Sequence, residues 1–239
     1  MEQFARTALL IGQEGVEKLH AARVAVFGIG GVGGHATESL VRCGVGTVDI
    51  FDDDRVSLTN LNRQLIATHD TIGRPKVEAM AERLHSINPR MQVNAHQLFY
   101  MPDQAENIDF SAFDYILDCI DTVTAKLDLV CRAHALGVPI ISAMGAGNRM
   151  DPTRLRVGDI YETQNCPLAR VMRRELRKRG IPALKVVYST EPALSPRAEE
   201  SDMAQEGLTR RAVPGSMAFV PPVMGMIMAS VVVRDLLGR

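Results

Sequence analysis

The sequence predicts an α/β fold with a mostly parallel sheet and helices on both of its faces. Three observations support this prediction. Short apolar stretches typical of buried strands recur along the chain, and helix-length segments separate them. The first stretch, Val24–Phe27, leads directly into a glycine-rich turn. Acidic residues follow two later stretches at their carboxyl ends, where open parallel sheets bind ligands.

The composition is that of an ordinary globular protein. The chain has 239 residues, of which 46% are hydrophobic and 23% charged, and a net charge of −1. That charge argues against a protein that coats nucleic acid, but it permits a local basic patch. The four cysteines are scattered without a CxxC pair, so no structural zinc is expected. No apolar signal region opens the chain, which favours a cytoplasmic protein.

The glycine turn predicts a phosphate site. Gly28, Gly30 and Gly33 fit the GxGxxG spacing, Gly31 lies between them, and a helix is expected over 35–42. Glycine allows a sharp turn and lets phosphate oxygens approach main-chain N–H groups, while the following helix adds a partial positive charge. Together these features indicate a Rossmann-like nucleotide-binding core over 1–150, with 151–239 as a substrate-side extension of the same domain.

The second strand, 47–51, ends in three carboxylates. Asp52 follows the glycine turn at about the spacing of an acid that binds ribose hydroxyls, and Asp54 comes two residues later. An NAD enzyme and an ATP enzyme remain equally compatible with these residues.

The next segment favours ATP. Asn60, Arg63 and Gln64 are polar, and Pro75 starts a helix that continues to about Ile87. Lys76 would lie in the first turn of that helix, an unfavourable place for a cation unless an anion is near. Each cation alone suits an exposed surface, but two cations and an amide beyond the ribose acid fit a triphosphate better than a nicotinamide.

Further strands are expected over 91–99, 113–121 and 139–143, with a helix over 123–136. Asp118 and Asp121 close the second of these strands. An acid at this edge suits Mg²⁺ or the nucleotide, whereas the alternative is that Asp121 only caps the helix.

The second half of the chain carries a basic helix over 167–179, between strands at 154–161 and 185–189. Four arginines share one face of it by their spacing: Arg170, Arg173, Arg174 and Arg177. They indicate either contact with an RNA backbone or a solvated helix face.

Three segments remain. A long irregular connection is expected over 190–214. An apolar helix follows, and it is expected to be buried in the core, because prolines interrupt its first part and leave it too short for a membrane span. Residues 1–22 suggest amphipathic helical pieces with five candidate buried positions: Leu9, Leu10, Ile11, Val16 and Leu19.

The ordered motifs resemble the adenylating domain of ubiquitin-activating-type enzymes, which includes the ThiF and MoeB proteins. The resemblance rests on 28–33, 52–54, 60–64, 73–76 and 118–121. It implies that Gly31 faces the phosphates, Asp52 the ribose and Asp121 the Mg²⁺. It further implies that Asn60, Arg63 and Lys76 bind the triphosphate. Relatives also place an arginine of the partner subunit of a homodimer at the γ-phosphate, for which Arg6 is the nearest candidate.

Within that family, 151–153, 188–191 and 215–221 resemble the branch that acts on tRNA. This implies ATP-dependent adenylation of the threonylcarbamoyl carboxylate on a tRNA adenosine, followed by ring closure with loss of water. A partner from a cysteine desulfurase system is compatible with it. The open alternatives are adenylation of a sulfur-carrier protein, an NAD-dependent oxidoreductase and a non-catalytic recruitment module.

Overall fold

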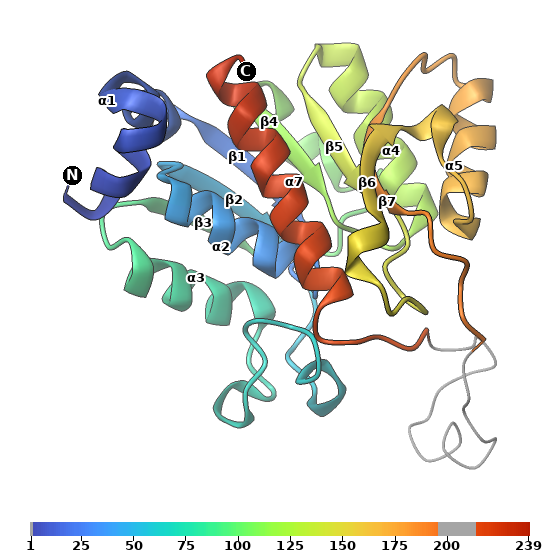
Figure 1. The fold of residues 1–239 in the computed structure, drawn as a ribbon, viewed down its shortest axis with the longest axis horizontal. Coiled ribbons are helices and arrows are strands. Elements are labelled where there is room, and N and C mark those ends of the chain that lie inside the picture. The colour runs from blue at the N-terminus through green and yellow to red at the C-terminus, as the bar shows by residue number, and fades with distance from the viewer. Residues whose placement is uncertain (1, 196–213) are drawn as a thin grey trace.

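One seven-stranded sheet organises the protein (Figure 1). The structure is a computed structural model that describes residues 2–195 and 214–239. The strand order is β3-β2-β1-β4-β5-β7-β6, and every neighbouring pair is parallel except β6 and β7. The strands are β1 (Arg23–Phe27), β2 (Thr47–Phe51), β3 (Gln92–His96), β4 (Tyr115–Asp118), β5 (Ile140–Ala143), β6 (Leu155–Asp159) and β7 (Lys185–Ser189).

Helices cover both faces of the sheet because the side chains of each strand alternate between two apolar cores. Val24 and Val26 face the core under α2 (Gly33–Cys43), α3 (Lys76–Ile87) and α7 (Val220–Leu237). Ala25 and Phe27 face the opposite core, which α4 (Val123–Leu136) covers. The part of the chain that the structure describes also contains the helices α1 (Ala5–Ala21) and α5 (Pro167–Lys178). The predicted α/β architecture, with its mostly parallel sheet, is therefore confirmed.

The strand order reverses at β1, whose two neighbours are β2 and β4. The chain winds outward in one direction through β2 and β3 and in the other through β4 and β5. In such sheets the crevice for ligands opens beyond the carboxyl ends of the strands at this reversal. The fold thus places the glycine turn after β1 beside the ends of β2 and β4.

The prediction for the N-terminal segment is partly wrong. Val16 and Leu19 are buried, but Leu9 is 86% and Leu10 80% exposed. The reason is Gly12, which has non-helical angles (φ 77°, ψ 168°) and divides α1 into two pieces with different facing. A single helical phase does not continue through that residue, so the first piece does not bury its leucines.

The C-terminal helix also differs from the expectation in one respect. Pro221 and Pro222 do not interrupt α7 but occupy its first turn, where their missing N–H groups cost nothing. Among the described residues α7 is the one helix long and apolar enough to pass for a membrane span, yet half of that window is buried inside the protein. Gly225 lies so close to α2 that a Cβ there would be 2.2 Å from the Val32 carbonyl oxygen. The helix is part of the core, as predicted.

Residues 196–213 of the predicted irregular connection lie outside the described residues. Its two described flanks, Leu194 and Gly215, both hydrogen bond to Asn148.

A fully buried ion pair fixes the end of β4. Lys126 Nζ lies 2.9 Å from Asp118 Oδ2, and both side chains are inaccessible to solvent. The same ammonium donates to the carbonyl oxygens of Ile120 and Ala143, at 3.1 and 2.8 Å. One lysine of α4 therefore ties together the ends of β4 and β5 beside the crevice.

We predict that Lys126→Met destabilises the protein by about 3–5 kcal/mol, because the substitution leaves the Asp118 carboxylate buried without a counter-charge. Urea unfolding at neutral pH measures this loss. Lys178→Met on α5 is the control, since that lysine side chain is 61% exposed, and we expect a change within about 0.5 kcal/mol. Equal losses for the two variants would contradict the role of the buried pair.

Candidate nucleotide-binding site

The glycines of the first turn have different structural roles. Gly28 has a φ of +91°, and a Cβ on it would lie 2.7 Å from the Cys119 carbonyl oxygen. A Cβ on Gly33 would lie 1.8 Å from the Gly28 carbonyl oxygen. A Cβ on Gly30, by contrast, would meet no atom within 4 Å. Gly28 and Gly33 therefore allow the backbone to fold closely, whereas Gly30 borders open space beside the start of α2.

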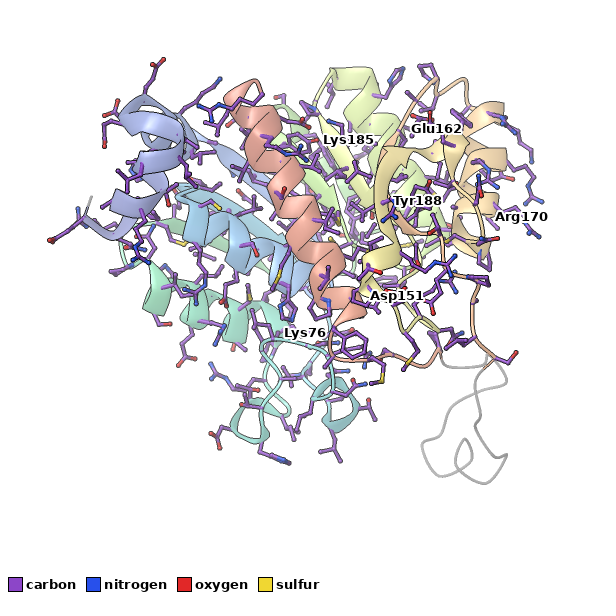
Figure 2. All side chains as sticks on the ribbon, viewed as in Figure 1. Lys76, Asp151, Glu162, Arg170, Lys185 and Tyr188 are labelled. Carbon is purple, nitrogen blue, oxygen red and sulfur yellow. The ribbon has the colours of Figure 1, made fainter. Side chains whose placement is uncertain are left out.

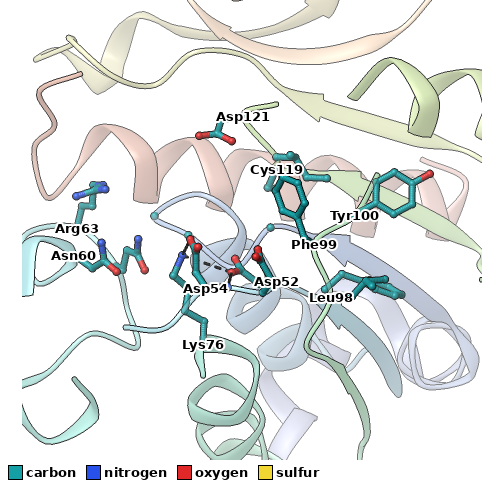
Figure 3. Close-up of a pocket in the computed structure, with 17 residues that line it drawn as sticks. Asp52, Asp54, Asn60, Arg63, Lys76, Leu98, Phe99, Tyr100, Cys119 and Asp121 are labelled. Carbon is teal, nitrogen blue, oxygen red and sulfur yellow. Dashed lines mark hydrogen bonds and ion pairs between the residues drawn. The ribbon is translucent and has the colours of Figure 1, made fainter. Parts of the chain in front are cut away.

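A cavity of about 420 Å³ opens over this turn (Figure 3). Every residue predicted to bind the nucleotide lines it except Gly33, which lies behind the turn. The predicted residues that line the cavity are Gly28, Gly30, Gly31, Asp52, Asp54, Asn60, Arg63, Gln64, Lys76 and Asp121. Residues far apart in the sequence thus meet at the carboxyl edge of the sheet.

One wall of this cavity is formed by Leu98, Phe99 and Tyr100, none of which was predicted to bind the nucleotide. Phe99 is 53% exposed, so a large apolar ring faces solvent at the mouth of the cavity. These residues follow β3, which ends at His96, so they lie at the ligand edge of the sheet, as Asp52 does after β2. The predicted strand over 91–99 included Leu98 and Phe99, and ending it at residue 96 would have identified them.

Asp52 is held in position by main-chain donors. Its Oδ2 accepts from the N–H of Ile29 at 2.6 Å, and its Oδ1 accepts from the N–H of Asp54 at 2.9 Å. Burial raises the pKa of Asp52, although the Lys76 ammonium acts in the opposite direction. The carboxylate is therefore clamped to the glycine turn, where it can accept hydrogen bonds from ligand hydroxyls.

Lys76 is the first residue of α3 and is only 4% exposed. Its Nζ lies 2.6 Å from Asp54 Oδ2 and 3.6 Å from Asp52 Oδ1. The position of Lys76 in the first turn predicts a nearby anion, and the anions found there are the carboxylates of Asp52 and Asp54. Because the Asp54 side chain is 65% exposed, the buried ammonium at the cavity wall can exchange that carboxylate for a phosphate oxygen.

Arg63 is half-buried, and no carboxylate pairs with it in the part of the chain that the structure describes. Its Nη1 donates to the carbonyl oxygen of Thr59 at 2.9 Å and to Asn62 Oδ1 at 2.8 Å. Burial lowers the pKa of the guanidinium. One nitrogen anchors the group, so Nε and Nη2 remain available for an anion in the cavity.

Asn60 and Gln64 flank Arg63. Asn60 Oδ1 accepts from the N–H of Ser57 at 3.1 Å, which caps a short helical turn. Gln64 is 7% exposed, and its buried Oε1 has no hydrogen-bond partner among the described residues. An unsatisfied buried acceptor at a cavity wall suits a ligand donor or a bound water.

The two acids at the end of β4 have different surroundings. Asp118 is neutralised by Lys126 and does not line the cavity. Asp121 is exposed and lies on the wall across the cavity from Lys76 (Figure 3). The alternative that Asp121 caps α4 is wrong, because the N-cap residue is Thr122. An exposed carboxylate at the cavity offers the oxygen ligands that Mg²⁺ prefers.

The thiols offer no activated nucleophile here. Cys119 lines the cavity, but burial raises the pKa of its thiol. Cys166 is 5% exposed at the N-cap of α5, where its sulfur accepts from the N–H of Ala169 at 3.5 Å. A nucleophilic cysteine instead needs a lowered pKa and access.

The basic helix α5 presents three of its four predicted arginines to solvent: Arg170, Arg174 and Arg177. Arg170 lies at the outer side of the helix (Figure 2). Arg173 is half-buried and donates to both oxygens of Thr163. It therefore anchors the helix, while the guanidinium of Arg177 lies 5.0 Å from the centre of the Tyr161 ring.

Arg6, the candidate arginine for a partner's site, is exposed on α1 and does not line the cavity of its own chain.

Comparison with known proteins agrees with this geometry. Residues 4–239 match the ThiF family. The tRNA threonylcarbamoyladenosine dehydratase of Bacillus subtilis is 42% identical over 245 residues, covering 99% of this chain and 95% of that protein. The sulfur carrier protein ThiS adenylyltransferase of Escherichia coli is 35% identical over 147 residues, covering 61% of this chain and 58% of the relative.

Solved structures give the same result. The crystal structure of E. coli tRNA N6-threonylcarbamoyladenosine dehydratase in complex with ATP has a TM-score of 0.88 and 31% identity, covering 99% of this chain and 94% of that one. The complex of the same enzyme with AMP has a TM-score of 0.89. The resemblance inferred from the motifs is confirmed, and the chain belongs to the ThiF family.

Proposed function

We propose that this protein uses ATP to adenylate the threonylcarbamoyl carboxylate of tRNA threonylcarbamoyladenosine and then closes the ring with loss of water. The observation that carries the proposal is the meeting of Asp52, Arg63 and Lys76 around one cavity on the glycine turn. The relative from B. subtilis, matched over nearly its whole length, is named for this reaction. The E. coli relative has been solved with ATP and with AMP, the nucleotide that the proposed reaction consumes and the one that it releases.

The chemistry has two steps. A carboxylate oxygen of the substrate attacks the α-phosphorus of ATP, the bond to the β-phosphate oxygen breaks, and pyrophosphate leaves. An internal nucleophile of the same modification then attacks the acyl carbon and loses its proton, and AMP departs as the ring closes. No covalent bond to the protein is needed, so the protein contributes positioning and charge stabilisation.

The residues divide this work. Asp52 binds the ribose hydroxyls and thereby fixes the sugar beside the glycine turn. Arg63 offers two donors from a planar group, which suits phosphate oxygens, and Lys76 offers a compact charge. Both stabilise the negative charge that develops on the departing pyrophosphate.

The charges that line the cavity support a divalent metal ion as part of the site. Four aspartates and two cations line it, so the wall is net negative before a triphosphate enters: Asp52, Asp53, Asp54, Asp121, Arg63 and Lys76. Lys76 already pairs with Asp52 and Asp54. Asp121, by contrast, has no cation partner in the described chain. We propose that Asp121 holds Mg²⁺, which would offset the charge of the phosphates.

We also propose that the chain works as one unit. Residues 1–150 supply the cavity, and 151–239 supply strands and helices that complete the same sheet and core. In support of this, β7 pairs with β5 across that division, and α7 returns to pack on α2.

Two other activities are less well supported. A sulfur-carrier adenylating enzyme remains within the family, but the relative named for it matches less of this chain. An NAD-dependent oxidoreductase has no use for two cations beyond the ribose acid.

Measuring ATP-dependent pyrophosphate release with tRNA, with a sulfur-carrier protein and with neither distinguishes these activities. Pyrophosphate release that requires tRNA and is not stimulated by the carrier protein supports the proposal. Release that requires the carrier protein and not tRNA contradicts it. No release with either substrate indicates a recruitment module.

We predict that Arg63→Ala and Lys76→Ala each lower tRNA-dependent pyrophosphate release by about 10²–10³-fold, because each removes a charge that stabilises the leaving group. Arg74→Ala is the matched control, since Arg74 lies beside Lys76 in sequence but pairs with Glu82 at 2.6 Å. Circular dichroism and thermal unfolding check that the variants fold. A folded Lys76→Ala variant with normal turnover would refute the assignment.

The exposed arginines of α5 are proposed to contact the tRNA backbone. We predict that the triple variant Arg170→Glu, Arg174→Glu, Arg177→Glu binds tRNA more weakly and leaves ATP affinity unchanged. Each lost phosphate contact should make the slope of log affinity against log salt shallower by about 0.7–0.9. Arg173 stays unchanged because it anchors the helix.

Filter binding over a salt series measures this effect. Reversal of two exposed cations elsewhere, Lys18 and Arg90, is the control. Unchanged tRNA affinity in the triple variant would show that this face is only solvated surface.

We propose that the protein is a homodimer in which α1 is buried. Leu9 and Leu10 are adjacent large apolar residues with exposures of 86% and 80%, and Arg6 lies on the same helical piece. Neighbouring exposed leucines at a helix surface indicate a contact with another chain. A second copy that packed on this helix through its own α1 would bring the partner's copy of this helix, with its arginine at position 6, to the contact.

We predict that Leu9→Glu combined with Leu10→Glu shifts the protein from dimer to monomer, because two charges would have to be buried at the contact. Analytical ultracentrifugation measures the mass, with Leu136→Glu, exposed at the end of α4, as the control. A monomeric wild-type protein, or a dimer in the double variant, would contradict the proposal.

A further inference from the structure

A chain of hydrogen bonds reaches Arg63 from outside the cavity. Arg63 Nη1 donates to Asn62 Oδ1 at 2.8 Å. The Asn62 amide nitrogen donates in turn to the carbonyl oxygen of Ser216 at 3.1 Å and lies 3.2 Å from Ser216 Oγ. Asn62 itself does not line the cavity, and its side chain is exposed. Its amide group therefore connects a cavity cation to residues that follow it by more than 150 positions.

The far end of this chain is also fixed. The N–H of Asn148 donates to the Gly215 carbonyl oxygen at 2.7 Å, and the N–H of Gly215 donates to Asn148 Oδ1 at 2.7 Å. Asn148 has a φ of +57°, a conformation that asparagine tolerates better than most residues. These two bonds hold Ser216 at one position relative to the loop after β5.

Arg63 needs such support because its own surroundings constrain only part of it. Its aliphatic stem lies against the glycine turn, since a Cβ on Gly31 would be 3.3 Å from Arg63 Cγ and 3.2 Å from Pro221 Cβ. The guanidinium beyond that stem has no carboxylate partner among the described residues. Two acceptors on Nη1, from Thr59 and Asn62, set the plane in which the remaining donors point. A planar donor group binds phosphate well only in one orientation.

We infer that Asn62 is a positioning residue for Arg63, and that Ser216 and Asn148 hold Asn62 in place. This inference rests on the proposed function for the role of Arg63 toward the triphosphate. It adds that a residue outside the cavity, supported by the C-terminal part of the chain, sets how that arginine meets the phosphates.

The test measures nucleotide binding and needs no tRNA. We expect Asn62→Ala to weaken ATP binding by about tenfold, the contribution of one hydrogen bond to a charged group. AMP binding should stay at the wild-type level, because AMP lacks the phosphates that Arg63 meets. Asn107→Ala is the control, since that asparagine is exposed and its side chain is remote from the chain of bonds. Isothermal titration calorimetry gives both affinities.

A double-mutant cycle separates positioning from a general structural effect. If Asn62 acts through Arg63, Asn62→Ala has no further effect on ATP affinity once Arg63 is alanine. An equal loss in both backgrounds, or wild-type ATP affinity in Asn62→Ala, would overturn the inference. Thermal unfolding of each variant checks that the fold persists.

Asn148→Gly tests the distal part of the chain. Glycine keeps the left-handed backbone but removes the oxygen that accepts from Gly215. We expect a smaller loss of ATP affinity, which also disappears in the Arg63→Ala background. Wild-type affinity in Asn148→Gly would overturn the part of the inference beyond Ser216. If the wild-type protein binds ATP but releases no pyrophosphate with tRNA, the proposed function is contradicted. The affinities of the Asn62 and Asn148 variants for ATP then still test the positioning of Arg63.

Discussion

The close contact between the first glycine turn and the end of β4 sets the geometry of the whole site. At Gly28 the backbone lies so near the Cys119 carbonyl that no side chain fits between them. That contact brings the start of α2, the carboxylate of Asp52 and the loop that bears Asp121 to one cavity. The ion pair of Asp118 with Lys126 supports the same loop from behind, in a region that water does not reach. Strong buried interactions thus hold the side of the site that must not move.

The two cations of the cavity are held in opposite ways, which implies different responses to a nucleotide. Lys76 is buried against carboxylates of the protein, so a phosphate must compete with Asp54 for it. Arg63 has no such competitor among the described residues, and neutral oxygens orient it. An incoming phosphate therefore meets Arg63 without first breaking an ion pair, whereas engaging Lys76 requires an exchange of partners. The net negative wall opposes that exchange, and a divalent metal that offset the remaining carboxylates would favour it.

Much of the sheet and most of the cavity could be predicted, because both follow from local patterns. Apolar stretches marked the strands, although the predicted ranges 91–99 and 113–121 run past the ends of β3 and β4, and acids after two strands met at one edge, as in Asp52 and Asp121. What failed depended on contacts that a pattern does not contain. The leucines at 9 and 10 fit a helical face, but Gly12 changes the direction of the backbone before that face reaches the core. The pairing of Asp118 with Lys126 carried no signal, because Lys126 is an ordinary helix residue in the sequence. Asn62 carried no signal, since its role depends on Ser216, which only the folded chain brings near.

The return of the C-terminal segment joins the second half of the chain to the cavity on the glycine turn. Helix α7 begins at the glycine turn, where Pro221 contacts Gly31, and it packs closely on α2 through Gly225. The segment before α7 hydrogen bonds to the loop after β5 through Asn148, and to Asn62 beside the cavity through Ser216. Short hydrogen bonds therefore join the loop after β5 to the segment that orients Arg63. The orientation of that guanidinium thus rests on residues from both halves of the chain, because Asn62 is held by Ser216 and the neighbouring Gly215 is held by Asn148.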